Sequence, residues 1–424
     1  MIQLAYIREN KQDVIARLAV KNMDATHDIE EIYTLDIEKR RIQTELEMLL
    51  AEQNSLAKQI GELFKSGKKA EAEDLRNRST AIKETCKSLE EKQTELEEQI
   101  KAILIRLPNI PSPQVPAGKT AEDNEVFLLD EHFMPKLDDA ALPHWELATK
   151  YDIIDFELGN KIAGAGFPVY KGMGAKLQRA LINFFLDNAG RAGYTEVQPP
   201  ILINEDSGFG TGQLPDKEGQ MYHVGLDNLY LIPTAEVPVT NIFRDTIVKA
   251  EDLPIKCTAY TPCFRREAGS YGAHVRGLNR LHQFDKVEIV QIAHPDHSYE
   301  TLNDMRNYVT GLLKLLELPY RVLKLCGGDM SFASALTYDM EVWSGAQKRW
   351  LEVSSVSNFE SFQANRLKLR YREGNAKPVL AHTLNGSALA LPRIVAALLE
   401  NNQEKDGIRI PAVLIPYTGF DKIK

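Results

Sequence analysis

Apolar residues recur at steps of three and four through two neighbouring segments near the N-terminus, 32–63 and 72–107. A Ser66-Gly67 break separates the two segments. Sustained heptads in two segments joined by a short glycine turn predict an antiparallel coiled coil. Helices of this length make an arm on the order of 50 Å long, which buries only one seam and is expected to project into solvent.

Four prolines fall within the segment 107–118, LPNIPSPQVPAG. Such a segment cannot continue a helix, and it predicts a stiff linker. We therefore place a domain boundary here. The expected organisation is an N-terminal domain over 1–106, with the helical hairpin at about 28–106, followed by a second domain over 119–424.

The second domain mixes helical and strand patterns. Helices are expected at 175–189, 237–246, 298–316 and 388–402, and strands at 229–233, 257–264, 281–292, 320–325, 338–343 and 350–355. The strands lie mostly far apart in the sequence and hairpins are common, which favours an α+β fold with a mainly antiparallel β-sheet flanked by helices. Neither GxGxxG nor GxxxxGK[ST] occurs, so the usual phosphate-loop folds are not supported.

The composition is typical of a soluble globular protein, with 43% hydrophobic and 26% charged residues. A chain of 424 residues is too long for one core, so two or more domains are expected. The four cysteines contain no CxxC pair, which argues against a structural zinc site or a disulfide framework and fits a reducing compartment. With no apolar signal core and no run of 18 apolar residues, we expect a cytoplasmic protein without a membrane span.

The net charge of −9 gives no global attraction for nucleic acid, and no DNA partner is expected. Along the predicted arm, however, residues 58–87 hold eight Lys or Arg against five Asp or Glu, while 28–57 and 88–105 together hold five against thirteen. A basic tip on an acidic stalk suits contact with a phosphate backbone. The plainer interpretation is a solvated coiled-coil surface with random charge drift. The candidate contacts are Lys58, Lys65, Lys68, Lys69, Arg76 and Arg78.

The most informative stretch runs from Cys263 to Glu288, CFRREAGSYGAHVRGLNRLHQFDKVE. An apolar strand ends in Arg265 and Glu267, a glycine-rich basic loop follows, and a second strand returns through Phe284. Arginine offers a planar fork matched to phosphate oxygens, and glycines let the backbone approach a ligand closely. Such a hairpin can hold a triphosphate and an amino acid together.

Six motifs, in order along the chain, resemble those of one family. They are GFGTGQLP (208–215), PTAE (233–236), FRREAGSYG (264–272), DMEVW (339–343), EVSSVSNFESFQANR (352–366) and TLNGSALA (383–390). With the arm, the whole chain resembles the bacterial-type seryl-tRNA synthetases, which are class II aminoacyl-tRNA synthetases. Motifs 1, 2 and 3 of that class would lie at about 175–200, 257–292 and 383–402.

This resemblance implies roles for individual residues. Arg265, Glu267 and Arg393 would be catalytic, with Arg265 touching the α-phosphate and the serine carboxylate. Serine would be bound by Thr234, Ala235, Glu236, Glu288 and Ser387. ATP would be bound by Arg265, Arg266, Glu267, Leu281, Phe284, Glu352, Val353, Ser354, Ser355 and Arg393, with adenine between Phe284 and Arg393. Leu281 would meet adenine through its backbone alone.

The resemblance also implies a Mg²⁺ ion that accompanies ATP, with Glu352 and Ser355 as its protein ligands. One carboxylate, one hydroxyl and phosphate oxygens suit Mg²⁺. Alternation along an ideal strand, however, puts Glu352 and Ser354 on one face and Ser355 on the other. Ser355 therefore needs a bend or a bulge, and Ser354 stays open as the alternative.

The function that the resemblance implies is serine–tRNA ligation. Serine and ATP would give seryl-adenylate, and the seryl group would pass to the 3′ end of tRNA(Ser), and of tRNA(Sec) where present. The arm would contact the tRNA, and motif 1 implies a homodimer. No histidine is required as a base, and a structural role is expected for His274, His282 and His382.

Two other classes of protein remain open at this point. One is a tRNA-independent relative that adenylates a small amino acid and loads a carrier protein. The intact arm and the lack of a cysteine at the matched pocket positions weigh against it. The other is a non-catalytic scaffold on the same fold, and the joint retention of Arg265, Glu267, Glu288, Glu352 and Arg393 weighs against that.

Overall fold

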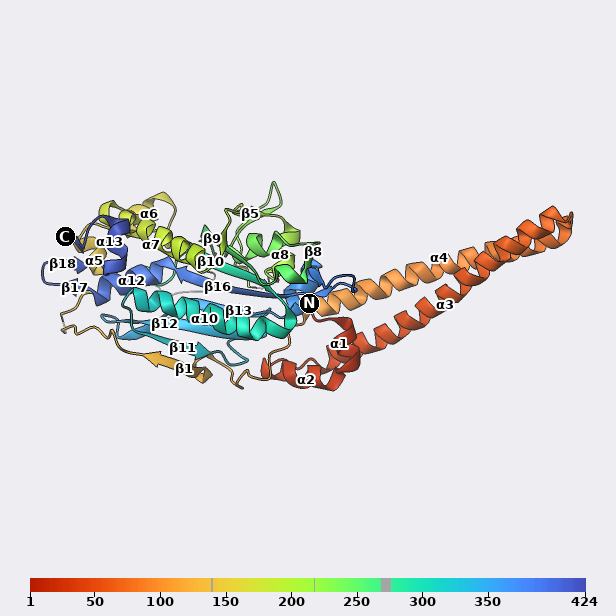
Figure 1. Ribbon diagram of the computed structural model, residues 1–424, viewed down its shortest axis with the longest axis horizontal. Helices are drawn as coiled ribbons and strands as arrows, with labels where there is room; N and C mark the ends of the chain where they lie inside the picture. Colours follow the sequence, from red (N-terminus) through yellow and green to blue (C-terminus); the bar gives the residue numbers. More distant parts are fainter. Residues whose placement is uncertain (139, 217, 268–275) are drawn as a thin grey trace. The chain divides into compact units, whose positions relative to one another are not determined.

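The computed structural model describes residues 1–138, 140–216, 218–267 and 276–424. They fold as two compact units, drawn together in Figure 1. The first unit comprises Met1–Ala19 and Met23–Pro108, and the second comprises Val20–Asn22 and Asn109–Lys424.

The first unit is helical. Its helices are α1 (Leu4–Glu9), α2 (Lys11–Val20), α3 (Thr26–Lys65) and α4 (Lys69–Arg106). Helices α3 and α4 form the predicted antiparallel hairpin (Figure 1), because their heptad positions bury one seam. Leu49 and Cys86 meet in an apolar cluster of that seam. Ion pairs flank it, with Lys39 Nζ 2.9 Å from Glu97 Oε1.

The second unit is built on an eight-stranded sheet in the order β1-β11-β12-β13-β16-β10-β9-β4. The strands are β1 (Glu125–Asp130), β4 (Thr195–Glu196), β9 (Ile255–Phe264), β10 (Gln283–Ala293), β11 (Tyr320–Lys324), β12 (Leu336–Ser344), β13 (Arg349–Asn358) and β16 (His382–Ala390). Every neighbouring pair is antiparallel except β4 with β9. The fold class predicted from the sequence is therefore confirmed.

Three long helices pack against this sheet, namely α7 (Gly172–Arg191), α10 (Ser298–Leu315) and α12 (Leu391–Asn401). Leu302, Met305 and Val309 show why α10 folds as it does, since steps of three and four place them on one buried face. These side chains join apolar residues of α7, α12 and the strands in one continuous core. The core holds the sheet rigid beneath the residues described below.

Smaller elements complete the unit. The shorter helices are α5 (His144–Lys150), α6 (Phe156–Ile162), α8 (Glu205–Thr211), α9 (Glu236–Asn241), α11 (Ser361–Leu367) and α13 (Ile415–Thr418). Four small sheets contain β2 (Ile154–Asp155), β3 (Val169–Tyr170), β5 (Leu202–Ile203), β6 (His223–Val224), β7 (Leu229–Leu231), β8 (Ile247–Lys249), β14 (Arg370–Arg372), β15 (Val379–Leu380), β17 (Gln403–Glu404), β18 (Gly407–Arg409) and β19 (Lys422–Ile423). Among the described residues, no helix combines the length and apolarity that a membrane span requires.

Two helix boundaries differ from the sequence prediction. The helix expected at 388–402 begins only at Leu391, and the residues before it continue strand β16. Pro392 lies in the first turn, where its missing N–H costs nothing, so the helix starts there. Helix α9, expected over 237–246, ends at Asn241, and the backbone N–H of Asp245 bonds to Leu367 O instead.

The first residues of the proline-rich segment pack within the second unit. Asn109, Ile110 and Ser112 are buried within the second unit. The side-chain amide of Asn109 donates to Ala333 O at 2.9 Å and to Phe359 O at 2.8 Å. The prolines end α4 as predicted, but these buried polar and apolar partners fix the segment that follows.

Candidate active site

Strands β9 and β10 carry the first group of candidate residues. They pair antiparallel from Ile255 with Ile292 to Phe264 with Gln283, and Arg265 N–H continues the pairing to His282 O at 2.9 Å. Arg265 and His282 therefore form the last backbone hydrogen bond of the hairpin within the described residues. The glycine-rich stretch 268–275, including His274, lies outside the described residues.

Arg265 is half-buried and its guanidinium is held on two sides. Its Nε donates to Pro233 O at 3.4 Å, and its Cζ lies 5.2 Å from the centre of the Phe284 ring. This stacking and hydrogen bonding fix the orientation of the planar fork, which then presents its remaining N–H groups for an anion. Arg266, by contrast, is exposed, and its backbone N–H donates to Gln220 O at 2.8 Å.

Glu267 has a left-handed backbone with a φ of 49°. Its carboxylate forms a close ion pair with Arg280. A non-glycine residue in this conformation is strained, and such strain is common at ligand sites. The chain turns at Glu267, just beyond the end of β9, and its carboxylate points to Arg280 on the segment that leads into β10.

A buried polar cluster lies beside this hairpin. Lys286 Nζ is 2.7 Å from Glu288 Oε2 and donates to Thr234 Oγ1 at 2.8 Å. Thr234 Oγ1 donates in turn to the same Glu288 oxygen at 3.1 Å. Thr234, Lys286 and Glu288 are 5%, 5% and 2% exposed, so this is a closed three-residue network in the interior.

Ser387 lies next to Glu288, because these two residues are register partners of β16 and β10. Ser387 and Asn385 are buried on β16, and Ala235 is fully buried at the start of α9. The structure thus brings together the five residues predicted for serine.

Glu236 is the second buried carboxylate of this cluster. Burial and the nearby charge of Glu288 raise its pKa from 4.5 to about 7, although hydrogen bonds from Gln363 and Asn385 oppose the rise. Gln363 Nε2 donates to Glu236 Oε1 at 2.7 Å, and Gln363 Oε1 accepts from Thr383 Oγ1 at 2.7 Å. Near neutral pH the protonated and the ionised forms of Glu236 are therefore both populated.

A bulge in β13 bears on the choice between Ser354 and Ser355 as a metal ligand. Met340 pairs with Ser354 and Glu341 pairs with Glu352, so Val353 is an extra residue in the strand. The bulge shifts the alternation by one position. Glu352 is exposed and Ser355 half-buried, whereas Ser354 is buried with its hydroxyl donating to Ser387 O at 2.6 Å. The geometry therefore favours Ser355 over Ser354.

Asp339, which the sequence analysis did not single out, lies across from Ser355 on β12. Burial, followed by the charge of Glu352, raises the pKa of the Asp339 carboxyl well above its ordinary value, against a hydrogen bond with Ser355. Its Oδ1 is buried and lacks a hydrogen-bond partner. The carboxylates of Glu352 and Asp339 and the hydroxyl of Ser355, with the unsatisfied Asp339 oxygen, fit a hard divalent cation such as Mg²⁺.

Arg393 projects from the start of α12 toward this group. Its Nη1 donates to Glu352 O at 2.7 Å, and its Nε donates to Asn279 O at 3.2 Å. Arg393 is thus tied to β13 and to the descending arm of the β9–β10 hairpin. Leu281 and Val353 have buried side chains, so any contact they make with a ligand would use the backbone.

The fully buried His144 holds the backbone next to Asn279 in place. His144 Nε2 accepts the Leu278 N–H at 2.8 Å, and His144 Nδ1 lies 2.8 Å from Glu400 Oε1 on α12. Both side chains are 0% exposed. This chain of contacts joins the hairpin to α12, and sequence reasoning missed it because its members are far apart in the sequence.

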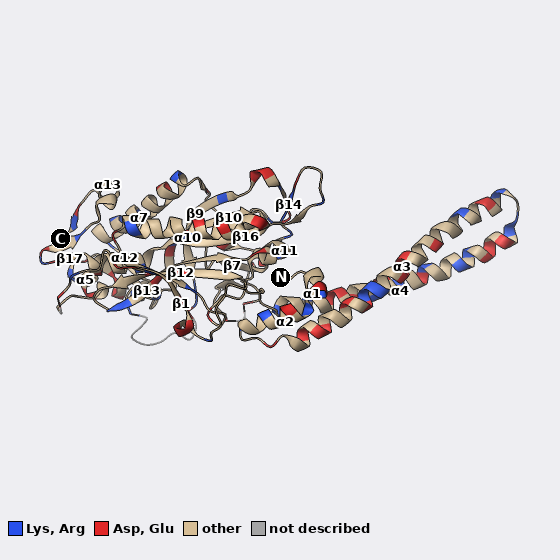
Figure 2. Ribbon diagram, turned by 60° about the horizontal axis from the view of Figure 1, so that its bottom comes forward, with Lys and Arg blue, Asp and Glu red and all other residues tan. Residues whose placement is uncertain are grey.

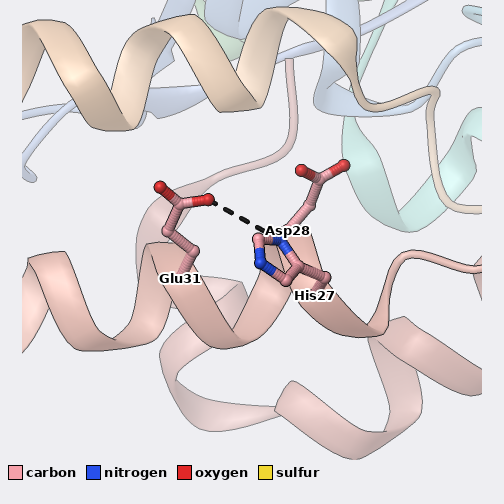
Figure 3. A group of neighbouring side chains, drawn as sticks. All are labelled: His27, Asp28 and Glu31. Atoms are coloured by element: carbon pink, nitrogen blue, oxygen red, sulfur yellow. Dashed lines mark ion pairs between the residues drawn. The ribbon is translucent and has the colours of Figure 1, made fainter.

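Other histidines have structural partners. His282 lies 2.8 Å from Tyr222 Oη, and His382 lies 2.8 Å from Ser298 Oγ. Burial lowers the pKa of His382 to about 4. Figure 3 shows His27, Asp28 and Glu31 of α3, whose ligand atoms are close enough to share a metal. Asp28 is already paired with Arg106, however, and exposed groups of this kind are common without a metal.

The candidate nucleic-acid contacts surround the turn between α3 and α4, with acidic residues among them (Figure 2). All six are exposed. Lys68, Arg76 and Arg78 pair with acidic residues of the hairpin, at 3.0, 3.8 and 2.5 Å. Lys58, Lys65 and Lys69 form no ion pair within the part of the chain that the structure describes. These three cations are the most available for phosphate.

Comparisons with known proteins agree with this geometry. The family profile of the seryl-tRNA synthetase N-terminal domain matches residues 1–111, and that of the class II tRNA synthetase core domain (G, H, P, S and T) matches 222–402. The serine–tRNA ligases of Salinibacter ruber and Chlorobium luteolum are 52% and 46% identical, and in each case the match covers 100% of this chain and 99% of the relative.

Solved structures give the same result. The seryl-tRNA synthetase of Pyrococcus horikoshii, complexed with ATP, is 35% identical with a TM-score of 0.92, over 100% of this chain and 99% of that one. The cytoplasmic serine–tRNA ligase of Naegleria fowleri, in complex with AMP, is 25% identical with a TM-score of 0.89 over the same shares. The chain therefore belongs to the seryl-tRNA synthetase family, the serine–tRNA ligases among the class II aminoacyl-tRNA synthetases.

Proposed function

We propose that the protein activates L-serine with ATP and transfers the seryl group to tRNA(Ser). In the first step a serine carboxylate oxygen attacks the α-phosphorus, an O–P bond forms, and pyrophosphate leaves. In the second step the 3′-terminal ribose hydroxyl of the tRNA attacks the seryl carbonyl, and AMP leaves. The observation that carries the proposal is the closed cluster of Thr234, Lys286 and Glu288 beside the fixed guanidinium of Arg265.

The roles of these residues follow from their chemistry. The first step brings two anions together, and Arg265 lowers that repulsion by binding the α-phosphate and the serine carboxylate. Glu267 faces ATP at the turn of the hairpin. Phe284 stacks on adenine, and Arg393 approaches from the side of Glu352. A relative complexed with ATP supports ATP as the substrate.

The serine side chain is placed in the buried cluster. Glu288 and Ser387 offer acceptors and donors for a hydroxyl, and a site built in this way rejects alanine because its own polar groups would be left unpaired. Glu236 and Thr234 complete the polar surroundings of the substrate ammonium group.

Mg²⁺ would be held by Glu352 and Ser355, with Asp339 beside them. When bound, the ion neutralises charge on the phosphates of ATP. The exposed carboxylate of Glu352 would bind that ion, and a hydrogen bond to Asp339 holds the hydroxyl of Ser355 in place.

The first unit is the tRNA-binding part in this proposal. Its basic tip, with Lys58, Lys65 and Lys69 unpaired within the described chain, would contact the tRNA backbone. A tRNA(Sec) of similar shape would also be charged with serine. All four cysteines are free and buried, which supports the cytoplasm as the compartment.

A homodimer through the motif 1 region is the proposed assembly. A cavity of about 520 Å³ opens on α7, and apolar Ile182 and Leu186 line it. Tyr170 Oη and Gln178 Oε1 border the same cavity, and both are buried without a hydrogen-bond partner. Unsatisfied polar atoms beside an apolar helix face suit coverage by a second copy.

Amino-acid-dependent exchange of pyrophosphate into ATP, measured with all twenty amino acids and without tRNA, tests the proposal. Exchange with serine alone is the expected result. Exchange with alanine or glycine would favour the carrier-loading relative, and no exchange from folded protein would favour the scaffold.

A further inference from the structure

The buried cluster contains a cation that no part of the proposed reaction uses. Lys286 follows Phe284 and precedes Glu288 at alternate positions of β10, so all three side chains lie on one face of the strand. Its ammonium contacts the buried Glu288 and Thr234, and the side chains of Lys286 and Glu288 are only 7% and 2% exposed.

The contacts of Lys286 leave little freedom to the groups around it. The Lys286 ammonium binds Glu288 Oε2 at 2.7 Å and Thr234 Oγ1 at 2.8 Å, and Thr234 then donates to the same Oε2 at 3.1 Å. One oxygen of Glu288 is therefore saturated from inside the protein. In the proposed function, the other oxygen is the one that meets the serine hydroxyl.

The charge of the cluster follows from these contacts. A buried carboxylate is costly unless it is paired, and Lys286 supplies the pair. The two charges cancel, so the ligand meets a hydrogen-bond acceptor of low net charge at Glu288. Without Lys286 the same position would hold an unpaired anion, which would attract a second cation in preference to a neutral group.

We propose that Lys286 determines which substrate side chain the pocket accepts. Its ammonium neutralises Glu288, and the pocket therefore selects the neutral hydroxyl of serine over a cationic side chain of the same size. The proposal rests on the proposed function. The competitor that it excludes is 2,3-diaminopropionate, which has an amine that can take up a proton where serine has its hydroxyl. This amine would bring a second positive charge next to Lys286, and like charges in a buried site repel strongly.

The substitution Lys286→Met tests the proposal, because methionine keeps most of the length of the side chain but removes its charge and donors. Pyrophosphate exchange at about pH 7 gives kcat/KM for serine and for 2,3-diaminopropionate. We expect the ratio of diaminopropionate to serine to rise about tenfold or more in the variant, with KM for ATP little changed. Lys286→Arg, which keeps the charge, should retain the preference of the unmodified protein.

Lys256→Met is the matched control, since Lys256 lies on β9 opposite Gln291, away from the buried cluster. An unchanged selectivity ratio in folded Lys286→Met would overturn the proposal, and so would an equal rise in the Lys256 variant. If Lys286→Met does not fold, Lys286→Gln takes its place, and a charge-free variant that keeps the original ratio refutes the idea. Failure of the unmodified protein to exchange with serine would instead refute the proposed function.

Discussion

Ionisation of the buried Glu236 carboxyl should lower the free energy of unfolding. Burial and the charge of Glu288 raise its pKa from 4.5 to about 7. The native state therefore holds this proton more tightly than the unfolded chain does. The stabilisation is fully present below about pH 4.5 and is lost as the pH rises through about 7.

The substitution Glu236→Gln removes this titration while it keeps an acceptor oxygen for Gln363. At roughly 1.4 kcal/mol for each pKa unit, ionised Glu236 costs about 3 kcal/mol at pH 8 relative to its protonated form. We therefore expect the variant to gain about 3 kcal/mol over the unmodified protein between pH 4.5 and pH 8.

Urea unfolding at fixed protein concentration, followed by tryptophan fluorescence from pH 5 to pH 8, measures this difference. The probe reports the second unit, because Trp145, Trp343 and Trp350 all lie there. Parallel stability curves for the two proteins would refute the reasoning.

Glu400→Gln provides a control of opposite sign. Burial opposes ionisation of Glu400, but hydrogen bonds from His144 and Ser344 outweigh it and hold its pKa below the ordinary value. Its stabilisation is present above about pH 4.5 and is lost only as the pH falls through the lowered native pKa. The Glu400 variant should therefore lose stability at neutral pH, where the Glu236 variant gains it.

Three further predictions concern the other parts of the molecule. Charge reversal of Lys65 and Lys69 together should raise KM for tRNA about tenfold or more in aminoacylation and leave pyrophosphate exchange unchanged, and equal damage to both assays would contradict the assignment of the arm. Asp339→Asn should weaken Mn²⁺ binding to the ATP complex, measured by electron paramagnetic resonance, and an unchanged affinity would remove Asp339 from the metal site. Gly277→Ala should destabilise the protein by roughly 2 kcal/mol or more and raise KM for ATP, because the new Cβ would lie 2.2 Å from His144 Nε2 and the backbone φ is +68°. A normal melting temperature and normal kinetics would show that the hairpin tolerates the added methyl group.

Much of the fold and of the candidate site could be predicted from the sequence, because the informative signals were local. Heptads over 32–63 and 72–107 define the hairpin without any tertiary contact. The candidate roles of Arg265 and Glu288 came from the resemblance of short, local motifs to those of the seryl-tRNA synthetases. The position of Lys286 beside Glu288 could also have been predicted, since Lys286 precedes Glu288 by two residues and therefore lies on the same face of the strand.

What the sequence did not give depends on distant contacts and on strand register. His144 and Glu400 are 256 residues apart, so nothing near either residue indicates their pairing. Asp339 becomes a candidate only when β12 is aligned with β13. The contacts of Asn109 with Ala333 and Phe359 could not be predicted from the proline-rich segment, because both partners lie more than two hundred residues away.

The extra residue of β13 makes the candidate metal site unusually sensitive to chain length. Substitution of Val353 by another apolar residue changes only packing, since its side chain is 1% exposed. Loss of its codon would restore regular alternation and turn every earlier position of the strand, Glu352 included, to the opposite side of the sheet. The site is therefore kept only if the number of residues in β13 is kept. This constraint acts on insertions and deletions rather than on side-chain chemistry.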